Sequence, residues 1–537
     1  MSLSARAPLS SSLSWRTLVL RAVAGLLALA MLLYGVAAID AGFVNFKSAG
    51  SADIAARRVA HQQAAEAGQP GDTPADVAGH SSVYIALLGM VSPPTYAYGE
   101  RGLSEPLIHY ATMPKANGVT LSLHNALGGT CMLFGALQFW PAFRRRFPRW
   151  HRAFGLVYLL AAQSAMIAAM VYLVRTPVAL IYDQLTFYIG LWSLAIGVTF
   201  SLWMAVYSMW RKQIAQHQAW MSLNYGMLLT APIQRYGWLA FGAFGPPLRQ
   251  LEANYAVTGV LVPLCVMFGY GLFSLNRWFQ ADRSSAARQK MAQAFTSHER
   301  AGRLLARVGL IVLLAAAVST VRHLMLAPGL SVLPHAAEWI PAGAMHMEDA
   351  VIAGQALPRW VLALATLAGL ASGAHLLWTA FARAPSVSSP VSPSGWHAER
   401  FMGVGTWVMA LSGLLVGIVM LRWGVQMGAP SFATLAGGSL YLFGGFITVV
   451  FSVLLAVALH RGQAAWVKEW GVFVLACLVA TPSFYWHLPL LGHAGFDAQY
   501  VQAGHVFRMA GVGQWLPLIG AFVYAVYSEA THSKLAR

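Results

Sequence analysis

Histidine is the residue type in this sequence whose number and placement could support chemistry. The chain has 17 histidines, and three of them, His124, His151 and His217, lie within or at the ends of long apolar runs. A neutral imidazole can bind haem iron, and it can exchange a proton near neutral pH. Because an ionisable side chain is costly inside a membrane, each of the three is a candidate functional residue.

Carboxylates are expected to be absent from the middle of the apolar runs. Asp40, Asp183 and Glu252 fall at the ends of runs or in the segments between them. Transporters coupled to protons or sodium ions commonly use such central carboxylates. The pattern therefore argues against that class.

Other reactive patterns are missing from the sequence. No P-loop, HExxH or GxSxG string occurs, which argues against ATP-driven transport, zinc proteolysis and serine hydrolysis. Cys131, Cys265 and Cys477 lie inside apolar runs without CxxC or CxxCH spacing. Disulfides, iron–sulfur clusters, structural zinc and covalently attached haem are therefore not expected.

Copper is a second metal to weigh against haem. The string AMHMED, residues 344–349, lies near His335 and offers thioether and imidazole ligands that suit copper. A chain with 21 methionines forms one such triplet readily by chance. Haem b is therefore the cofactor that the histidines predict, and copper is not expected.

The elements that must position these histidines are long apolar segments. The chain of 537 residues is 58% hydrophobic and 10% charged, and apolar windows of about 18 to 26 residues recur about twelve times. Because an open strand edge is not viable in hydrocarbon, these segments must be helices. The sequence therefore predicts an all-α, polytopic transmembrane helical bundle of about twelve spans. The predicted spans are residues 17–40, 117–141, 153–174, 184–209, 219–244, 255–276, 305–325, 358–382, 401–425, 437–459, 469–488 and 509–529.

Charge placement predicts the orientation of the bundle. The net charge is +17, and the basic string FRRRFPRWHRAFG, residues 143–155, separates two apolar windows. Alternating the loops from a cytoplasmic N-terminus puts most Lys and Arg on the cytoplasmic side, as the positive-inside rule requires. Both termini are then cytoplasmic, and residues 17–40 form an uncleaved signal anchor. The basic residues indicate contact with a lipid bilayer, not with nucleic acid.

Two halves of six helices are expected. Residues 1–277 include a large outer loop, 41–116, whose first half is predicted to be mobile or loosely helical, and 278–304 form a basic cytoplasmic linker before 305–537. Two dipeptides recur in parallel positions of the halves: Trp150-His151 matches Trp396-His397, and Ala219-Trp220 matches Ala465-Trp466. Either duplication or chance explains two shared dipeptides.

The predicted topology arranges the histidines in two layers. His151 and His217 open helices that run in the same direction, so they share the inner depth, while His124 lies toward the outer side. A b-type haem takes two neutral imidazoles at one depth from facing helices. Helical steps from His124 reach Gly128 and Gly135, a face that would let a flat macrocycle or a neighbouring helix approach closely.

The strings LSLHNALGGTCMLFGALQFWPAFRRRFPRWHRAFGLVYLL and QHQAWMSLNY resemble a family of predicted bacterial membrane proteins, domain-of-unknown-function family 2306. The resemblance covers residues 117 to about 240, which we expect to form a compact bundle in a bacterial inner membrane. It implies that His124, His151 and His217 belong to one motif set. The motif positions are His124, Gly128, Gly129, Gly135, Gln138, Phe139, Pro148, His151, Arg152, Gly155, Tyr158, His217, Trp220, Met221 and Tyr225.

Three functions fit these observations. The preferred one is b-type haem electron transfer or quinone-linked redox, with His124, His151 and His217 binding the cofactor and a quinone or a redox protein as partner. The same histidines could instead line the polar path of a transporter or channel for a small or lipid-like substrate. The third is a non-catalytic assembly partner in the membrane. Whether the chain is an enzyme, and its oligomeric state, are left open by the residues.

Overall fold

A computed structural model describes residues 15–68, 82–100, 102–281, 299–382, 396–428, 430–460 and 464–535. Within these ranges 88% of residues are helical and no strand occurs, so the all-α prediction is confirmed. Residues 282–298, which are most of the predicted linker, lie outside the described ranges. So do residues 69–81 of the outer loop and Gln463, just before α20.

Ten helices of the described ranges are long and apolar enough to cross a membrane, and each overlaps a predicted span. The chain is therefore a multi-span membrane protein. The ten spans are built from α1 (Trp15–Ser48), α8 (Pro148–Arg175), α9 (Gln184–Trp210), α12 (Gln250–Ala281), α14 (Glu299–Thr320), α17 (Ala356–Leu377), α18 (Trp396–Gln426), α19 (Gly437–His460), α20 (Ala464–Gly492), and α22 (His505–Gly513) together with α23 (Leu516–Leu535).

The other two predicted spans correspond to helices of a different kind. Residues 117–141 lie mainly in α6 (Lys115–Gln138), which has 24 residues but carries polar side chains such as His124 along its length. Residues 219–244 are divided between α10 (Ile214–Leu228) and α11 (Thr230–Phe244). Pro232 in the first turn of α11 has no N–H to continue the α10 hydrogen-bond ladder, which explains the break.

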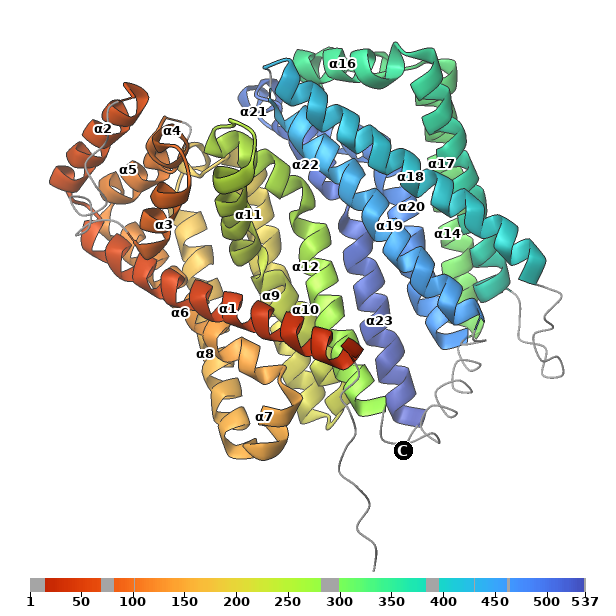
Figure 1. Cartoon of the computed structure of the whole chain (residues 1–537), viewed down its shortest axis with the longest axis horizontal. Helices are drawn as coiled ribbons and strands as arrows, with labels where there is room; N and C mark the ends of the chain where they lie inside the picture. The colour runs from red at the N-terminus through yellow and green to blue at the C-terminus, as the bar shows by residue number, and fades with distance from the viewer. Residues whose placement is uncertain are drawn as a thin grey trace, which may run out of the picture.

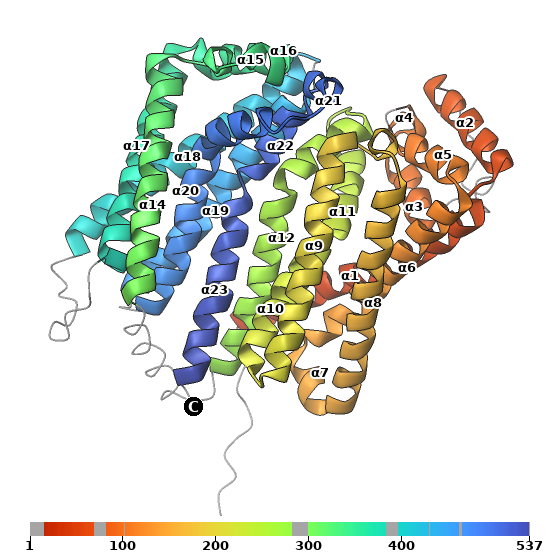
Figure 2. The same cartoon turned by 180° about the vertical axis from the view of Figure 1, so that it is seen from behind.

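The two halves of the chain lie side by side (Figures 1 and 2). Residues 15–281 form one side of the molecule and 299–535 the other, with α12 and α23 at the junction. Helix α1 crosses the N-terminal half at a steep tilt against α6. We call the end of the bundle where α1 begins and α23 ends the inner end, and the opposite end the outer end.

The outer loop is more ordered than the sequence indicates. Its described residues form α2 (Ala52–Glu66), α3 (Val83–Val91), α4 (Pro94–Tyr98) and α5 (Ser104–Thr112) at the outer end. Leu88, Tyr96 and Trp238 are buried together, and the Tyr96 hydroxyl donates to the Trp238 carbonyl over 2.8 Å. The expectation of a mobile or loosely helical segment concerned the first half of the loop, whose described residues form α2. The second half packs its apolar side chains on α11, a partner that composition does not reveal.

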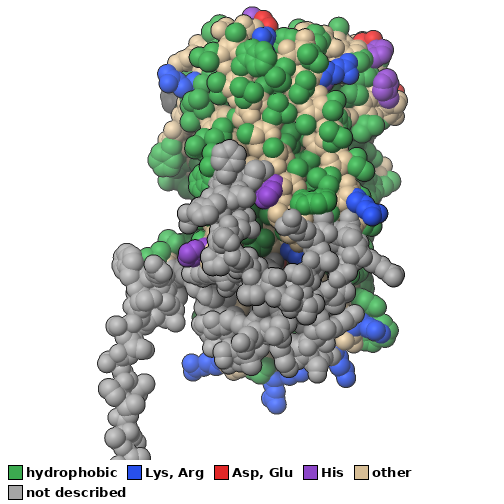
Figure 3. Space-filling view, turned by 90° about the vertical axis from the view of Figure 1, so that its right-hand side faces the viewer, with side chains coloured by type: hydrophobic (Ala, Val, Ile, Leu, Met, Phe, Trp, Pro, Cys, Tyr) green, Lys and Arg blue, Asp and Glu red, His purple; other side chains and the backbone are tan. Residues whose placement is uncertain are grey.

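The outer surface fits a lipid environment. Figure 3 shows the face formed by the C-terminal half, where hydrophobic side chains cover much of the described surface and the visible acidic ones gather at the outer end. Ile311 and Leu314 of α14 are 68% and 66% exposed, and Leu357 of α17 is 75% exposed. Side chains of this kind are stable when exposed to hydrocarbon and not to water.

A buried ion pair joins the halves near the inner end. The guanidinium of Arg277 on α12 holds Glu469 on α20 with two bonds, of 2.6 and 2.9 Å. The Tyr270 hydroxyl also donates to Glu469, and the Trp470 indole donates to Tyr270 over 2.8 Å. Because Glu469 is 2% exposed, this bidentate pairing satisfies a carboxylate that water cannot reach.

A second pair joins the halves near the outer end. Asp183, just before α9, is paired with Arg508 on α22. Beside it the His505 ring contacts Thr186 over 2.8 Å and Gln184 over 3.3 Å. The two halves are therefore held together at both ends by buried polar contacts, with an apolar core between them.

Glu469→Gln is expected to destabilise the protein by about 3 to 5 kcal/mol, because it leaves the Arg277 guanidinium buried without its carboxylate. The measurement is the free energy of unfolding in mixed detergent micelles. Asp53→Asn is the matched control, since Asp53 pairs with Arg57 while the two side chains are 69% and 64% exposed. That exposed pair contributes about 0 to 1 kcal/mol. Equal effects of the two substitutions would contradict a structural role for the buried pair.

Candidate functional site

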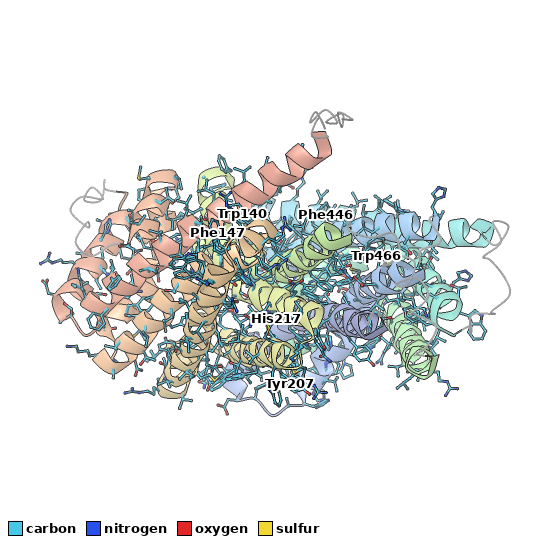
Figure 4. All side chains as sticks on the ribbon, turned by 90° about the horizontal axis from the view of Figure 1, so that it is seen from below. Trp140, Phe147, Tyr207, His217, Phe446 and Trp466 are labelled. Atoms are coloured by element: carbon cyan, nitrogen blue, oxygen red, sulfur yellow. The ribbon has the colours of Figure 1, made fainter. Side chains whose placement is uncertain are left out.

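His151 and His217 meet at the inner end of the N-terminal half. Each is the fourth residue of its helix, α8 for His151 and α10 for His217. Pro148 starts α8, where a proline fits the first helical position. The two imidazoles are close enough to act on each other electrostatically, and the Arg144 guanidinium acts on both. Figure 4 shows the region from the inner end.

The hydrogen bonds of the two rings set opposite proton positions. The Gln138 amide satisfies its neighbours when its nitrogen donates to Nδ1 of His151 over 3.0 Å and its oxygen accepts from the Gly155 N–H over 3.3 Å. A neutral ring that accepts at Nδ1 carries its proton on Nε2. Nδ1 of His217 lies 2.9 Å from the Ala205 carbonyl, so it must donate, and Nε2 keeps its lone pair. Nε2 of His151 can therefore donate a hydrogen bond to a ligand, whereas Nε2 of His217 can accept one.

Aromatic rings cluster where α7 (Pro141–Arg146) packs on the first turns of α8, the helix that carries His151. Phe143 and Phe154 are parallel, 5.9 Å apart, and Trp140 stacks on Phe143 at 6.3 Å. Trp140 is 56% exposed and Phe147 44% exposed, and Figure 4 shows these two side chains close together at the inner end. A flat, partly apolar ligand could stack here at the edge of the bilayer.

A buried polar network holds the two histidine-bearing helices in place. The Tyr158 hydroxyl of α8 donates to the Asn224 side chain of α10 over 2.6 Å. The Asn224 amide in turn donates to the Val198 carbonyl and the Ser201 hydroxyl of α9, over 2.8 and 3.0 Å. Because all of these groups are paired inside the bundle, the network favours one relative position of α8 and α10.

His124 lies at a different depth. Its Nδ1 is 2.9 Å from the Ala165 carbonyl of α8, and Ala165 follows His151 by 14 residues, or about 21 Å along the helix. His124 therefore cannot share a ligand atom with His151 and His217. In the described part of the chain, no group of three or more His, Cys, Asp or Glu side chains is placed to hold a metal ion.

Two glycines on one face of α6, Gly128 and Gly135, lie in different surroundings. A Cβ atom on Gly135 would lie 2.3 Å from the Tyr225 ring and 2.9 Å from the Tyr158 ring, so glycine is needed for those tyrosines to pack. A Cβ atom on Gly128, nearer to His124, would meet nothing within 4 Å. Close helix packing therefore uses the inner part of this face, while the part beside His124 stays open.

Residues 121–269 match the model of a family described as "Predicted membrane protein (DUF2306)". We call these residues the DUF2306 segment. It extends from α6 through most of α12 and contains His124, His151 and His217. The resemblance drawn from the sequence motifs is thus confirmed for a segment only. No curated protein and no solved structure matches the chain.

Several site residues were not predicted from the sequence. Asn224 and Arg144 carry no motif signal, and their contacts depend on how the DUF2306 helices pack. No carboxylate was expected in the middle of an apolar run, and two carboxylates, Glu469 and Glu348, are buried near helix ends. Glu469 begins a predicted span, and Glu348 folds inward from a loop, so hydropathy alone does not mark either as buried.

Gly135→Ala is expected to lower the free energy of unfolding by about 1 to 3 kcal/mol, because the added methyl group would overlap the Tyr225 ring and force α10 away from α6. Gly128→Ala is the control on the same helix. There the methyl group meets open space and alanine favours the helix, so stability should be unchanged or slightly higher. Thermal unfolding of the two purified variants checks this, and equal losses would refute the packing assigned to Gly135.

Proposed function

We propose that the DUF2306 segment binds the headgroup of a membrane quinone at its inner end and works in quinone-linked electron transfer. The observation that carries the proposal is the opposed hydrogen bonding of His151 and His217. A quinone carbonyl accepts a hydrogen bond, and a quinol hydroxyl donates one. An Nε2–H on His151 and an Nε2 lone pair on His217 supply both partners.

The surroundings of the two histidines support a ligand of this shape. The headgroup is flat and the tail is apolar, which matches stacked rings that open toward lipid at Trp140 and Phe147. A quinone that takes two electrons also takes two protons, and imidazoles exchange protons near neutral pH. The electrons would come from a one-electron carrier of the haem class.

Haem b is the second candidate ligand, favoured by His124 and His217. Each directs its Nδ1 to a helix carbonyl and leaves Nε2 as a lone pair, the arrangement that commonly orients a metal-binding imidazole. Ligation of one iron by His151 and His217 would require His151 to move its proton from Nε2. The Gln138 amide favours the opposite tautomer, so the quinone proposal ranks first.

The proposal includes a location and an orientation. The inner end would face the cytoplasm of a bacterial cell, and the membrane would be the cell membrane. Arg144, Arg145 and Arg146 end α7 at the inner end, and Arg149 and Arg152 follow in α8. Basic residues at this end fit the positive-inside rule.

His151→Ala and His217→Ala should each weaken the binding of a short-chain quinone about tenfold, the effect of losing one hydrogen bond of about 1 to 1.5 kcal/mol. Binding is measured by quenching of tryptophan fluorescence in lipid nanodiscs. His346→Ala is the control, because His346 is exposed on the outer side and contacts Trp423. Gln138→Leu should weaken binding less, since Gln138 orients His151.

Absorption spectra of the same preparations, made with a haem precursor present, separate the two candidates. Stoichiometric haem that is lost in both His151→Ala and His217→Ala would replace the quinone proposal with a bis-histidine cytochrome. Quinone affinity that is the same in the parent protein and both variants would reject the site altogether.

A further inference from the structure

The C-terminal half contains a small cavity whose wall is mainly apolar but carries several hydroxyl groups, and it shares no residue with the histidine pair. It lies among α14, α17, α18, α19 and α20, and its volume is about 40 Å³. A cavity needs roughly 10 to 15 Å³ of this kind of space for one water molecule, so this one holds about three. Its polar lining residues are Thr320, Thr366, Ser412, Tyr441, Thr448, Thr481 and Tyr485.

The hydroxyl groups around this cavity fall into two sets. Thr320 and Thr448 donate to carbonyls of their own helices, as hydroxyls inside helices commonly do. Thr366, Thr481 and Tyr485 make no hydrogen bond with any residue that the structure describes. A hydroxyl both donates and accepts, so water in the cavity would satisfy these groups.

The C-terminal half also buries a carboxyl, which is not itself part of the cavity wall. Glu348, the last residue of α16 (Ala342–Glu348), is 7% exposed, and its carboxylate accepts from the Leu330 N–H over 2.7 Å. Across the described ranges no lysine or arginine forms an ion pair with it. Glu348 acts electrostatically on Tyr441 and Tyr485, which both line the cavity.

An unpaired carboxylate is costly to bury, so this group favours its neutral form. Burial is the largest cause, and the neighbouring Asp349 charge adds to it, while the Leu330 N–H opposes both. Together they raise the pKa of the Glu348 carboxyl to about 7. Glu348 can therefore gain and lose a proton near neutral pH.

Three π-helical turns surround this end of the half: η3 (Val321–Leu326), η5 (Asp349–Ala353) and η8 (Phe432–Ala436). Such turns are rare and occur often at functional sites. In η3, His323 is buried and stacks on the Tyr485 ring at 4.3 Å, and its Nδ1 has no partner among the described residues. Two of these turns therefore place titratable groups near Glu348 or its tyrosines, His323 of η3 and Asp349 of η5.

We propose that Glu348, a buried carboxyl without a cation partner, binds and releases a proton and, through Tyr441 and Tyr485 that line the cavity, forms the outer part of a proton path into the C-terminal half. The site is independent of the quinone proposal, because no residue is shared. The groups that face Glu348 are Asp349 of η5, Tyr441 of α19, Tyr485 of α20 with His323 of η3 stacked on it, and the Leu330 N–H of η4 (Leu330–Val332).

Infrared difference spectroscopy of the whole protein in nanodiscs tests the proton site directly. A protonated carboxyl gives a C=O stretching band that shifts in D2O, and its loss should have a midpoint near pH 7. Glu348→Gln should lack the band. Glu338→Gln, which changes an acid that is 65% exposed on α15 (Ala336–Trp339), should keep it. A band that persists in Glu348→Gln would overturn the assignment.

Two further measurements test the role of the cavity and the nature of the ligand. Thr481→Val removes a hydroxyl from the cavity wall and should raise the midpoint of the band, because fewer waters solvate the ionised carboxylate. An unchanged midpoint would show that the cavity and Glu348 are not linked. If sodium chloride removes the band at constant pH while choline chloride does not, Glu348 binds a cation and the proton proposal fails.

Stability against pH gives a readout that does not depend on spectroscopy. A carboxyl whose pKa is raised on folding, from 4.5 to about 7, stabilises the fold most below pH 4.5. That contribution is lost as the pH rises to about 7. The unfolding temperature of the parent protein should therefore fall relative to that of Glu348→Gln over this range. A difference that is constant with pH would contradict titration of Glu348.

Discussion

Two buried ion pairs fix how the two halves of the chain lie against each other. Arg277 with Glu469 at the inner end, and Asp183 with Arg508 at the outer end, join the halves where lipid excludes water. Breaking either pair would leave a charge without solvent or partner, so the relative position of the halves is strongly constrained. The apolar core between them, which includes Phe273 and Phe473, adds contact area without fixing direction.

The two halves divide the polar chemistry between them. In the N-terminal half, histidines with opposite proton positions lie at the inner end beside stacked aromatic rings. In the C-terminal half, a buried carboxyl without a cation partner lies at the outer end, and hydroxyl groups face a cavity among the same helices. Both sites consist of groups that exchange protons, and they lie on opposite sides of the bundle.

Packing inside the bundle is set by small residues as much as by large ones. Gly135 lets two tyrosines lie against α6, while Gly128 leaves open space beside His124. In a membrane the hydrophobic effect does not drive helices together, so close backbone approach and satisfied polar groups select the arrangement. The Tyr158 and Asn224 network is an example, since it joins three helices through paired polar groups.

The sequence by itself determined the class of the protein, because the length and apolar character of a span follow directly from the thickness of the bilayer. It also indicated that His151 and His217 lie at the same end, since both begin helices that run in one direction. Only the tertiary structure decided that Gln138 and Ala205 set the proton positions of these two histidines. It also decided that Glu348, in the segment before α17, is buried, and that Arg277 pairs with Glu469, 192 residues away in the chain. Hydropathy describes each segment alone, whereas the partner of a buried polar group is chosen by packing between segments distant in the chain.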